Sequence, residues 1–245
     1  MNPAASPVPR RVVAVSPHLD DAAFSAGGFL AGLAAAGADV LLLTVYTATV
    51  PDPRGFALAC QLDKGLDADV DYMALRRAED AAAVGALGVR GRHLPLAEAP
   101  HRGYTSAAAL FGDVVAGDED QPEVVAEHVR AVLEEEFGDG SGGVDLLLGP
   151  QALGDHVDHR HVRDAVDLLR AGRDLPVSRW ADTPYLLRPG AQEPRGAARP
   201  PTAGELDAKV AACAAYATQL GFQFDGVAAM GEALRATPEF FEPVG

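Results

Sequence analysis

The chain has little cysteine and little positive charge, and each shortage excludes a class of protein. Only two of its 245 residues are cysteines, Cys60 and Cys213, so it can form neither a disulfide framework nor a cysteine-rich metal site. Its 20 lysine and arginine residues are outnumbered by 35 aspartate and glutamate residues. The net charge of −15 disfavours partners that need a basic face, namely nucleic acids and anionic membranes.

The sequence also lacks a long, strongly apolar run. Its first residues contain prolines and no apolar stretch, which is unlike a secretory signal. Residues 22–50 carry one charge, Asp39, but their first half is mostly alanine and glycine, which favours a helix followed by a strand over a membrane span. We therefore expect a cytoplasmic protein without membrane contact. Its hydrophobic fraction of 48% suits one folded domain over residues 1–245.

Apolar strands alternate with helices along the chain. Residues 12–16 and 40–46 are apolar and rich in β-branched side chains, and a helix from Asp20 or Asp21 to about Ala36 lies between them. This order is typical of a parallel sheet, so the sequence predicts an α/β fold with a mostly parallel sheet flanked by helices. Further strands are expected at residues 93–96, 144–149 and 183–187, and further helices at residues 73–88, 122–137, 158–170 and 202–220.

Two long loops follow predicted strands, at residues 47–71 and 98–120. Both are longer than simple connections require, so we predict that they form the substrate pocket rather than structural insertions. Arg102 and Tyr104 in the second loop are predicted to bind a polar substrate.

Histidine and aspartate gather at the ends of two predicted strands. The first strand leads into His18-Leu19-Asp20-Asp21, and a later one leads into residues 155–161, which hold three of the seven histidines. Ligands bind beyond the carboxyl ends of strands in open α/β sheets, so the two groups are expected to meet. A catalytic zinc ion takes three such ligands and keeps one position open, and iron or manganese also fits.

Each of these residues has a simpler interpretation when taken alone. Asp20, Asp21 and Asp158 would serve as helix caps, and His161 would be a solvated surface residue. Capping explains neither the histidines nor the second of two adjacent acids. The cluster as a whole therefore indicates a functional site.

The two motifs, in this order, resemble those of the LmbE-like or PIG-L family of zinc-dependent deacetylases. The usual first motif of that family is His-Pro-Asp-Asp-Glu, and here Leu19 and Ala22 replace the proline and the glutamate. Weaker similarities lie at residues 76–79 with Gly88, and at residues 216–219. The resemblance covers roughly residues 11–220.

The resemblance implies a Rossmann-like fold and hydrolysis of an N-acyl group, usually N-acetyl, from a small molecule such as an amino sugar or a secondary-metabolite intermediate. It implies one zinc ion per chain. By position, the metal ligands are His18, Asp21 and His159, the general base is Asp20, the oxyanion is stabilised by His156, and a histidine is oriented by Asp158. Some members also use a tyrosine just before the second motif. Residues 151–155 contain none, so that role falls to another residue or is absent.

Several alternatives stay open at this stage. His156 lies three residues from His159, so either could be the ligand, and His156 could also be a solvated loop residue. The chain could be a thiol-conjugate amidase, or an inactive metal-binding member that serves as an interaction protein. A nucleotide-binding Rossmann module is disfavoured, because the turn after the first strand carries His and Asp instead of Gly-x-Gly-x-x-Gly. A homo-oligomer would be compatible with the sequence.

Overall fold

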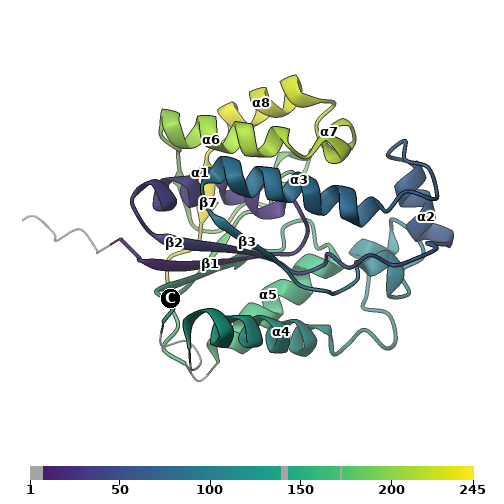
Figure 1. The fold of residues 1–245 in the computed structure, drawn as a ribbon, viewed down its shortest axis with the longest axis horizontal. Coiled ribbons are helices and arrows are strands. Elements are labelled where there is room, and N and C mark those ends of the chain that lie inside the picture. The colour runs from purple at the N-terminus through teal and green to yellow at the C-terminus, as the bar shows by residue number, and fades with distance from the viewer. Residues whose placement is uncertain (1–7, 139–142, 172) are drawn as a thin grey trace, which may run out of the picture.

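The computed structural model describes residues 8–138, 143–171 and 173–245 and contains a seven-stranded sheet with helices on both faces (Figure 1). The strands are β1 (Arg11–Ser16), β2 (Asp39–Thr44), β3 (Arg90–His93), β4 (Leu146–Pro150), β5 (Val177–Trp180), β6 (Ala197–Arg199) and β7 (Glu239–Phe241). The helices are α1 (Asp21–Ala35), α2 (Gly55–Leu62), α3 (Tyr72–Leu87), α4 (Gln121–Phe137), α5 (Val157–Arg170), α6 (Ala203–Ala214), α7 (Ala217–Gln223) and α8 (Val227–Ala236). Of these helices, none is both long and apolar enough to cross a bilayer.

The strand order is β3-β2-β1-β4-β5-β7-β6. Strands β1 to β5 are all parallel to one another, whereas β7 pairs antiparallel with β5 and β6. The chain moves outward from β1 through β2 and β3, and then returns to place β4 on the other side of β1. The boundary between β1 and β4 is therefore the topological switch point, where open α/β sheets bind their ligands.

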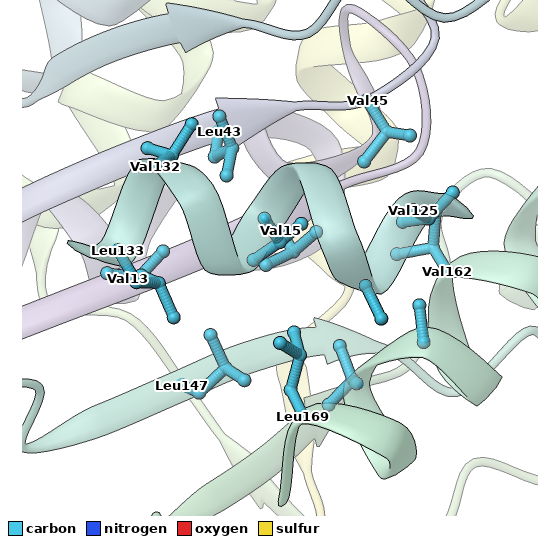
Figure 2. Close-up of a cluster of buried hydrophobic side chains, with 14 of the residues drawn as sticks. Val13, Val15, Leu43, Val45, Val125, Val132, Leu133, Leu147, Val162 and Leu169 are labelled. Atoms are coloured by element: carbon cyan, nitrogen blue, oxygen red, sulfur yellow. The ribbon is translucent and has the colours of Figure 1, made fainter. Parts of the chain in front are cut away.

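Strands β1, β2 and β4 are apolar on both faces because helices cover both sides of the sheet. On one side, Val13, Val15 and Leu147 of the sheet pack against Val162 of α5 and Val125 of α4 (Figure 2). On the other side, α1 lies against the sheet, and α3 and α6 pack against α1 (Figure 1). Helix α1 and helix α5 thus approach the switch point from opposite faces.

The fold class predicted from the sequence is confirmed, and so are the strands at residues 12–16 and 144–149. The strand expected at residues 93–96 lies at residues 90–93, because its arginines form ion pairs at the charged sheet edge and hide the apolar pattern. The edge strand expected at residues 183–187 is wrong, since a cis Thr183–Pro184 bond and a 3₁₀ turn occupy that segment. The helix expected at residues 202–220 is interrupted between α6 and α7.

A buried ion pair fixes the middle of α1. The Glu239 carboxylate on β7 accepts hydrogen bonds from the backbone N–H groups of Gly28 (2.8 Å) and Phe29 (2.9 Å). It also accepts one from the Lys209 ammonium of α6 at 2.9 Å, and both charged side chains are almost fully buried. Strand β7, which lies between β5 and β6, is therefore bonded to the helix whose first turn carries the aspartate motif.

Candidate active site

The two sequence motifs meet at the carboxyl ends of neighbouring strands. β1 and β4 run side by side, with Val12 opposite Leu146 and Ala14 opposite Leu148. The segment after β1 carries His18 and leads into α1, and the segment after β4 leads into α5. The switch point therefore brings residues 18–21 next to residues 156–159, as the strand pattern predicted.

His18, Asp21 and His159 form one group that could hold a metal ion. Their ligand atoms all lie within 4.8 Å of one another. Asp21 Oδ2 is 3.1 Å from His18 Nδ1 and 3.2 Å from His159 Nε2. Burial tends to raise the pKa of Asp21, but the facing His159 and His18 hold it well below its usual value. The carboxylate is thus ionised, as a metal ligand must be.

The state of His159 indicates that this group suits a cation. Its side chain is fully buried, and its Nδ1 lies 2.7 Å from Asp182. Its Nε2 is buried and lies 3.2 Å from Asp21 Oδ2, but within residues 8–138, 143–171 and 173–245 none of its contacts has hydrogen-bond geometry. A buried polar atom without a partner is costly, and a metal ion between His159, His18 and Asp21 would satisfy it. The donor set of two imidazoles and one carboxylate is one that zinc accepts in catalytic sites.

Each of the two histidines is also held from behind by a buried carboxylate. Asp158 Oδ2 lies 2.9 Å from His18 Nε2, and Asp182 Oδ1 lies 2.7 Å from His159 Nδ1. Carboxylates in this position fix the tautomer and the ring orientation of metal-binding histidines. Asp158 thus contacts His18 directly. Asp182 was missed in the sequence because β5, which ends two residues before it, was not recognised as a strand.

A second group of potential ligands consists of His18, His156 and Asp158. The Asp158 carboxylate is already engaged, because Oδ1 accepts from Arg102 Nη2 (2.7 Å) and Oδ2 accepts from the backbone N–H of Ala99 (3.1 Å). A carboxylate paired with a guanidinium is a weaker metal ligand. The group around the unpartnered His159 nitrogen therefore suits a metal ion better.

Asp20 adjoins this site but lies outside the ligand group. It makes no capping hydrogen bond to α1, so the capping interpretation is wrong for its side chain. Instead its carboxylate lies 3.3 Å from Arg76 Nη2 and accepts a hydrogen bond from Gln223 Nε2 at 3.1 Å. Burial raises the pKa of Asp20 to about 7. Its side chain faces the cleft together with His18 and Asp21.

His156, rather than Asp158, caps helix α5. Its Nδ1 accepts a hydrogen bond from the backbone N–H of Asp158 at 3.2 Å. Burial lowers the pKa of His156 to about 3, so the ring is neutral near pH 7. Because Nδ1 is an acceptor, the ring proton resides on Nε2. His156 lines the cleft and can offer that N–H to a bound molecule. His161 is likewise buried and not a solvated residue.

Arg102 and Tyr104 do not occupy the positions expected of substrate-binding residues. Neither lines the cleft, because both side chains turn toward the buried Asp118, and Arg102 also turns toward Asp158. Arg102 donates to both carboxylates, with Nε 2.8 Å from Asp118 and Nη2 2.7 Å from Asp158. Tyr104 is fully buried and donates to Asp118 at 2.9 Å. Arg102 therefore supports Asp158, and Tyr104 supports Asp118, rather than lining the cleft.

The cleft above the site has a volume of about 470 Å³, within the usual range for pockets that take drug-sized ligands. Both long loops contribute to its walls, and residues 47–71 include α2, which was expected to be loop. Helix α2 lies at the edge of the molecule, away from the sheet (Figure 1). The cleft lining combines charged and polar side chains with apolar ones, and the apolar ones include Phe56, Val70, Leu110, Phe111 and Phe222.

Comparison with known proteins identifies the family. The family model described as PIG-L: GlcNAc-PI de-N-acetylase matches residues 13–169, more than half of the chain and both motifs. The chain belongs to the PIG-L family. This PIG-L protein is 33% identical over 160 residues to 2'-N-acetylparomamine deacetylase of Streptomyces fradiae. It is 44% identical over 85 residues to 1D-myo-inositol 2-acetamido-2-deoxy-alpha-D-glucopyranoside deacetylase of Corynebacterium glutamicum. These matches cover 64% and 34% of the chain, but only 50% and 28% of the two relatives.

Solved structures of PIG-L-like deacetylases match nearly the whole chain. The zinc-inhibited form of teicoplanin deacetylase Orf2 has a TM-score of 0.79 at 27% identity, and the match covers 96% of this chain and 98% of that one. The A40926 pseudoaglycone deacetylase Dbv21 has a TM-score of 0.78 at 27% identity, with coverage of 96% and 97%. This PIG-L protein therefore has the fold of deacetylases that include antibiotic-modifying members.

The Asp182 contact leads to a prediction about metal affinity. Asp182→Asn is expected to weaken zinc binding by about 10- to 100-fold, since the partner that orients His159 is lost. Titration against a chromophoric chelator measures this. The matched control is Asp80→Asn, which alters a buried carboxylate that lies 2.7 Å from His93 and outside both ligand groups. Equal zinc affinity in the Asp182 variant and the control would contradict an orienting role.

Proposed function

We propose that the chain is a metal-dependent N-deacetylase that holds one divalent ion, zinc by preference, between His18, Asp21 and His159. The observation that carries this proposal is the buried Nε2 of His159, which faces His18 and Asp21 and makes no well-aligned hydrogen bond within the described residues. A metal ion in such a site acidifies water and polarises an amide carbonyl.

The residues around the ligand group supply the rest of the chemistry. Asp20, which is not in the ligand group, accepts the proton of the attacking water and later delivers it to the departing amine. His156 donates its Nε2–H to the amide oxygen as negative charge develops there. Asp158 and Asp182 hold the histidines in place. The reaction cleaves the amide C–N bond and yields a carboxylate and a free amine.

The substrate that we propose is an N-acetylated amino sugar carried on a larger body. The named relatives are deacetylases of 2'-N-acetylparomamine, of an acetamido sugar of myo-inositol, of teicoplanin and of A40926 pseudoaglycone. The cleft volume and the apolar side chains in its lining suit such a body better than a free monosaccharide. Substrate contacts would come from the residues lining the cleft rather than from Arg102 and Tyr104, which lie behind it.

The experiment that tests the proposal incubates zinc-loaded protein with a panel of N-acetylated compounds. The panel contains acetylated aminoglycosides, acetamido sugars of myo-inositol, glycopeptide pseudoaglycones and thiol-conjugate amides. Mass spectrometry then detects the free amine together with one equivalent of acetate. Release from the amino-sugar conjugates is expected. Release from thiol conjugates alone would identify an amidase instead, and bound zinc without any turnover would identify an inactive member.

His159→Ala is expected to abolish stoichiometric metal binding. Purified wild-type protein should contain about one metal ion per chain by elemental analysis, whereas the variant should contain almost none. The control is His161→Ala, because His161 is also buried in α5 but belongs to neither ligand group. Full metal occupancy in the His159 variant would overturn the ligand assignment. After both proteins are stripped of metal with a chelator, added zinc should raise the melting temperature of the wild type and leave that of the variant unchanged.

A further inference from the structure

Tyr185 lines the cleft, and its hydroxyl forms no hydrogen bond with any other described residue. It lies in the 3₁₀ turn η3 (Tyr185–Leu187) after β5, and its half-buried side chain lines the cleft. Within the described ranges, its hydroxyl has no hydrogen-bond partner, unlike that of Tyr72, which accepts from Gln219. A polar group that lines a cleft and has no partner in the protein is typical of a position that orients a ligand.

Ring contacts place Tyr185 on the same side of the site as His156. The Tyr185 ring meets His159 edge-on, with the centroids 5.2 Å apart. Phe111 contacts both candidate donors, with its centroid 6.2 Å from Tyr185 and 5.4 Å from His156. The partners of Asp20 come from α3 and α7 instead, so the base approaches from other elements.

Neighbouring parts of the chain make room for the Tyr185 ring and pack against it. A Cβ atom on Gly154 would come within 2.4 Å of Tyr185 Cδ1, and Gly154 has a left-handed φ of +82°, so this glycine leaves the space that the ring fills. The Arg188 guanidinium packs over the ring, 4.3 Å from its centroid. Asp182, which orients His159, precedes Tyr185 by only three residues. One short segment thus carries both the residue that orients His159 and this phenol.

The phenol keeps its proton near neutral pH. A tyrosine hydroxyl ordinarily has a pKa of about 10, well above neutral pH. The hydroxyl is therefore a donor to any anionic oxygen that develops in the cleft, and it needs no change of protonation to act.

We propose that Tyr185 is a further catalytic residue, whose hydroxyl donates a hydrogen bond to the oxygen of the scissile amide beside the His156 N–H. This inference rests on the proposed function. Attack of water converts the carbonyl oxygen into an oxyanion, and paired donors aimed at that oxygen stabilise the transition state more than the ground state. No proton is transferred from Tyr185, and the bonds made and broken are those of amide hydrolysis.

Tyr185→Phe tests the proposal, because it removes the donor and keeps the ring. With an N-acetylated amino-sugar conjugate that the wild type hydrolyses, kcat is expected to fall about 10- to 100-fold while KM and zinc stoichiometry stay the same. The affinity of a methylphosphonamidate analogue, which mimics the tetrahedral oxyanion, should fall by the same factor as kcat/KM. The affinity for the amine product should not change.

Tyr216→Phe is the matched control, since it also removes a buried tyrosine hydroxyl but outside the cleft. That hydroxyl donates to Asp80 at 2.7 Å, so the control should lower the melting temperature and leave kcat unchanged. Wild-type kcat in Tyr185→Phe overturns the inference alone. A raised KM at unchanged kcat also overturns it and indicates ground-state binding. Wild-type protein that releases acetate from none of the compounds overturns the proposed function and this inference with it.

Discussion

Asp20→Asn is expected to lower the rate of deacetylation by about 10² to 10⁴ while the protein keeps its metal and its fold. Asparagine has the size of aspartate and can still contact Arg76 and Gln223, but it cannot accept a proton. The variant therefore isolates proton transfer from packing. Steady-state rates, zinc content and a thermal melt on the same preparation give the three quantities needed.

The Asp20→Asn variant also distinguishes a general base from a residue that only caps α1. Asparagine caps helices about as well as aspartate, so a capping residue would tolerate the change. The structure gives Asp20 no capping hydrogen bond to α1, and its carboxylate faces the cleft. Near wild-type turnover in Asp20→Asn would remove the general-base assignment and require another proton acceptor.

His156→Ala is expected to reduce turnover by about 10² to 10³, with metal retained. The donor acts as charge develops on the amide oxygen, so the loss should appear in kcat more than in KM. A modest loss of stability should accompany it, because His156 Nδ1 caps α5. His156→Asn separates the two effects, since asparagine restores the cap and lacks the imidazole donor.

Metal content distinguishes the remaining interpretations of His156. If His156 were a ligand, as its membership of the group with His18 and Asp158 would allow, the alanine variant would lose its metal. If it were a solvated loop residue, the variant would keep both metal and turnover, but the side chain is buried and lines the cleft. Only retained metal with slow turnover agrees with the oxyanion role.

The site residues that the sequence predicts are those that closely follow a recognisable strand in the chain. His18 and Asp21 follow one apolar strand and His159 follows another, and strand order alone brings parallel strand ends together. Asp182, Tyr185 and Gln223 could not be found this way, because their neighbours in space are distant in sequence. β5 is only four residues long and includes Arg179, so its pattern does not stand out as a strand.

The errors in the substrate-binding residues have a similar physical origin. Composition indicated that the loop at residues 98–120 is polar and functional, and part of it does line the cleft. Composition did not indicate which side chains of the loop point into the cleft and which point into the protein. Arg102 and Tyr104 turn inward because Asp118 and Asp158 are buried carboxylates that need donors, and such demands arise only in the folded chain.

The hydrogen bonds between the Glu239 carboxylate and the middle of α1 couple the position of that helix to strand β7. The anchored N–H groups of Gly28 and Phe29 lie about two turns from Asp21, a distance of roughly 10 Å along the helix axis. A packed helix moves as a rigid body, so a small tilt at the anchor is transmitted to the turn that carries Asp20 and Asp21. Substitutions at Glu239 or Lys209, neither of which lines the cleft, can thereby tune the spacing between the proposed base and the ligand group.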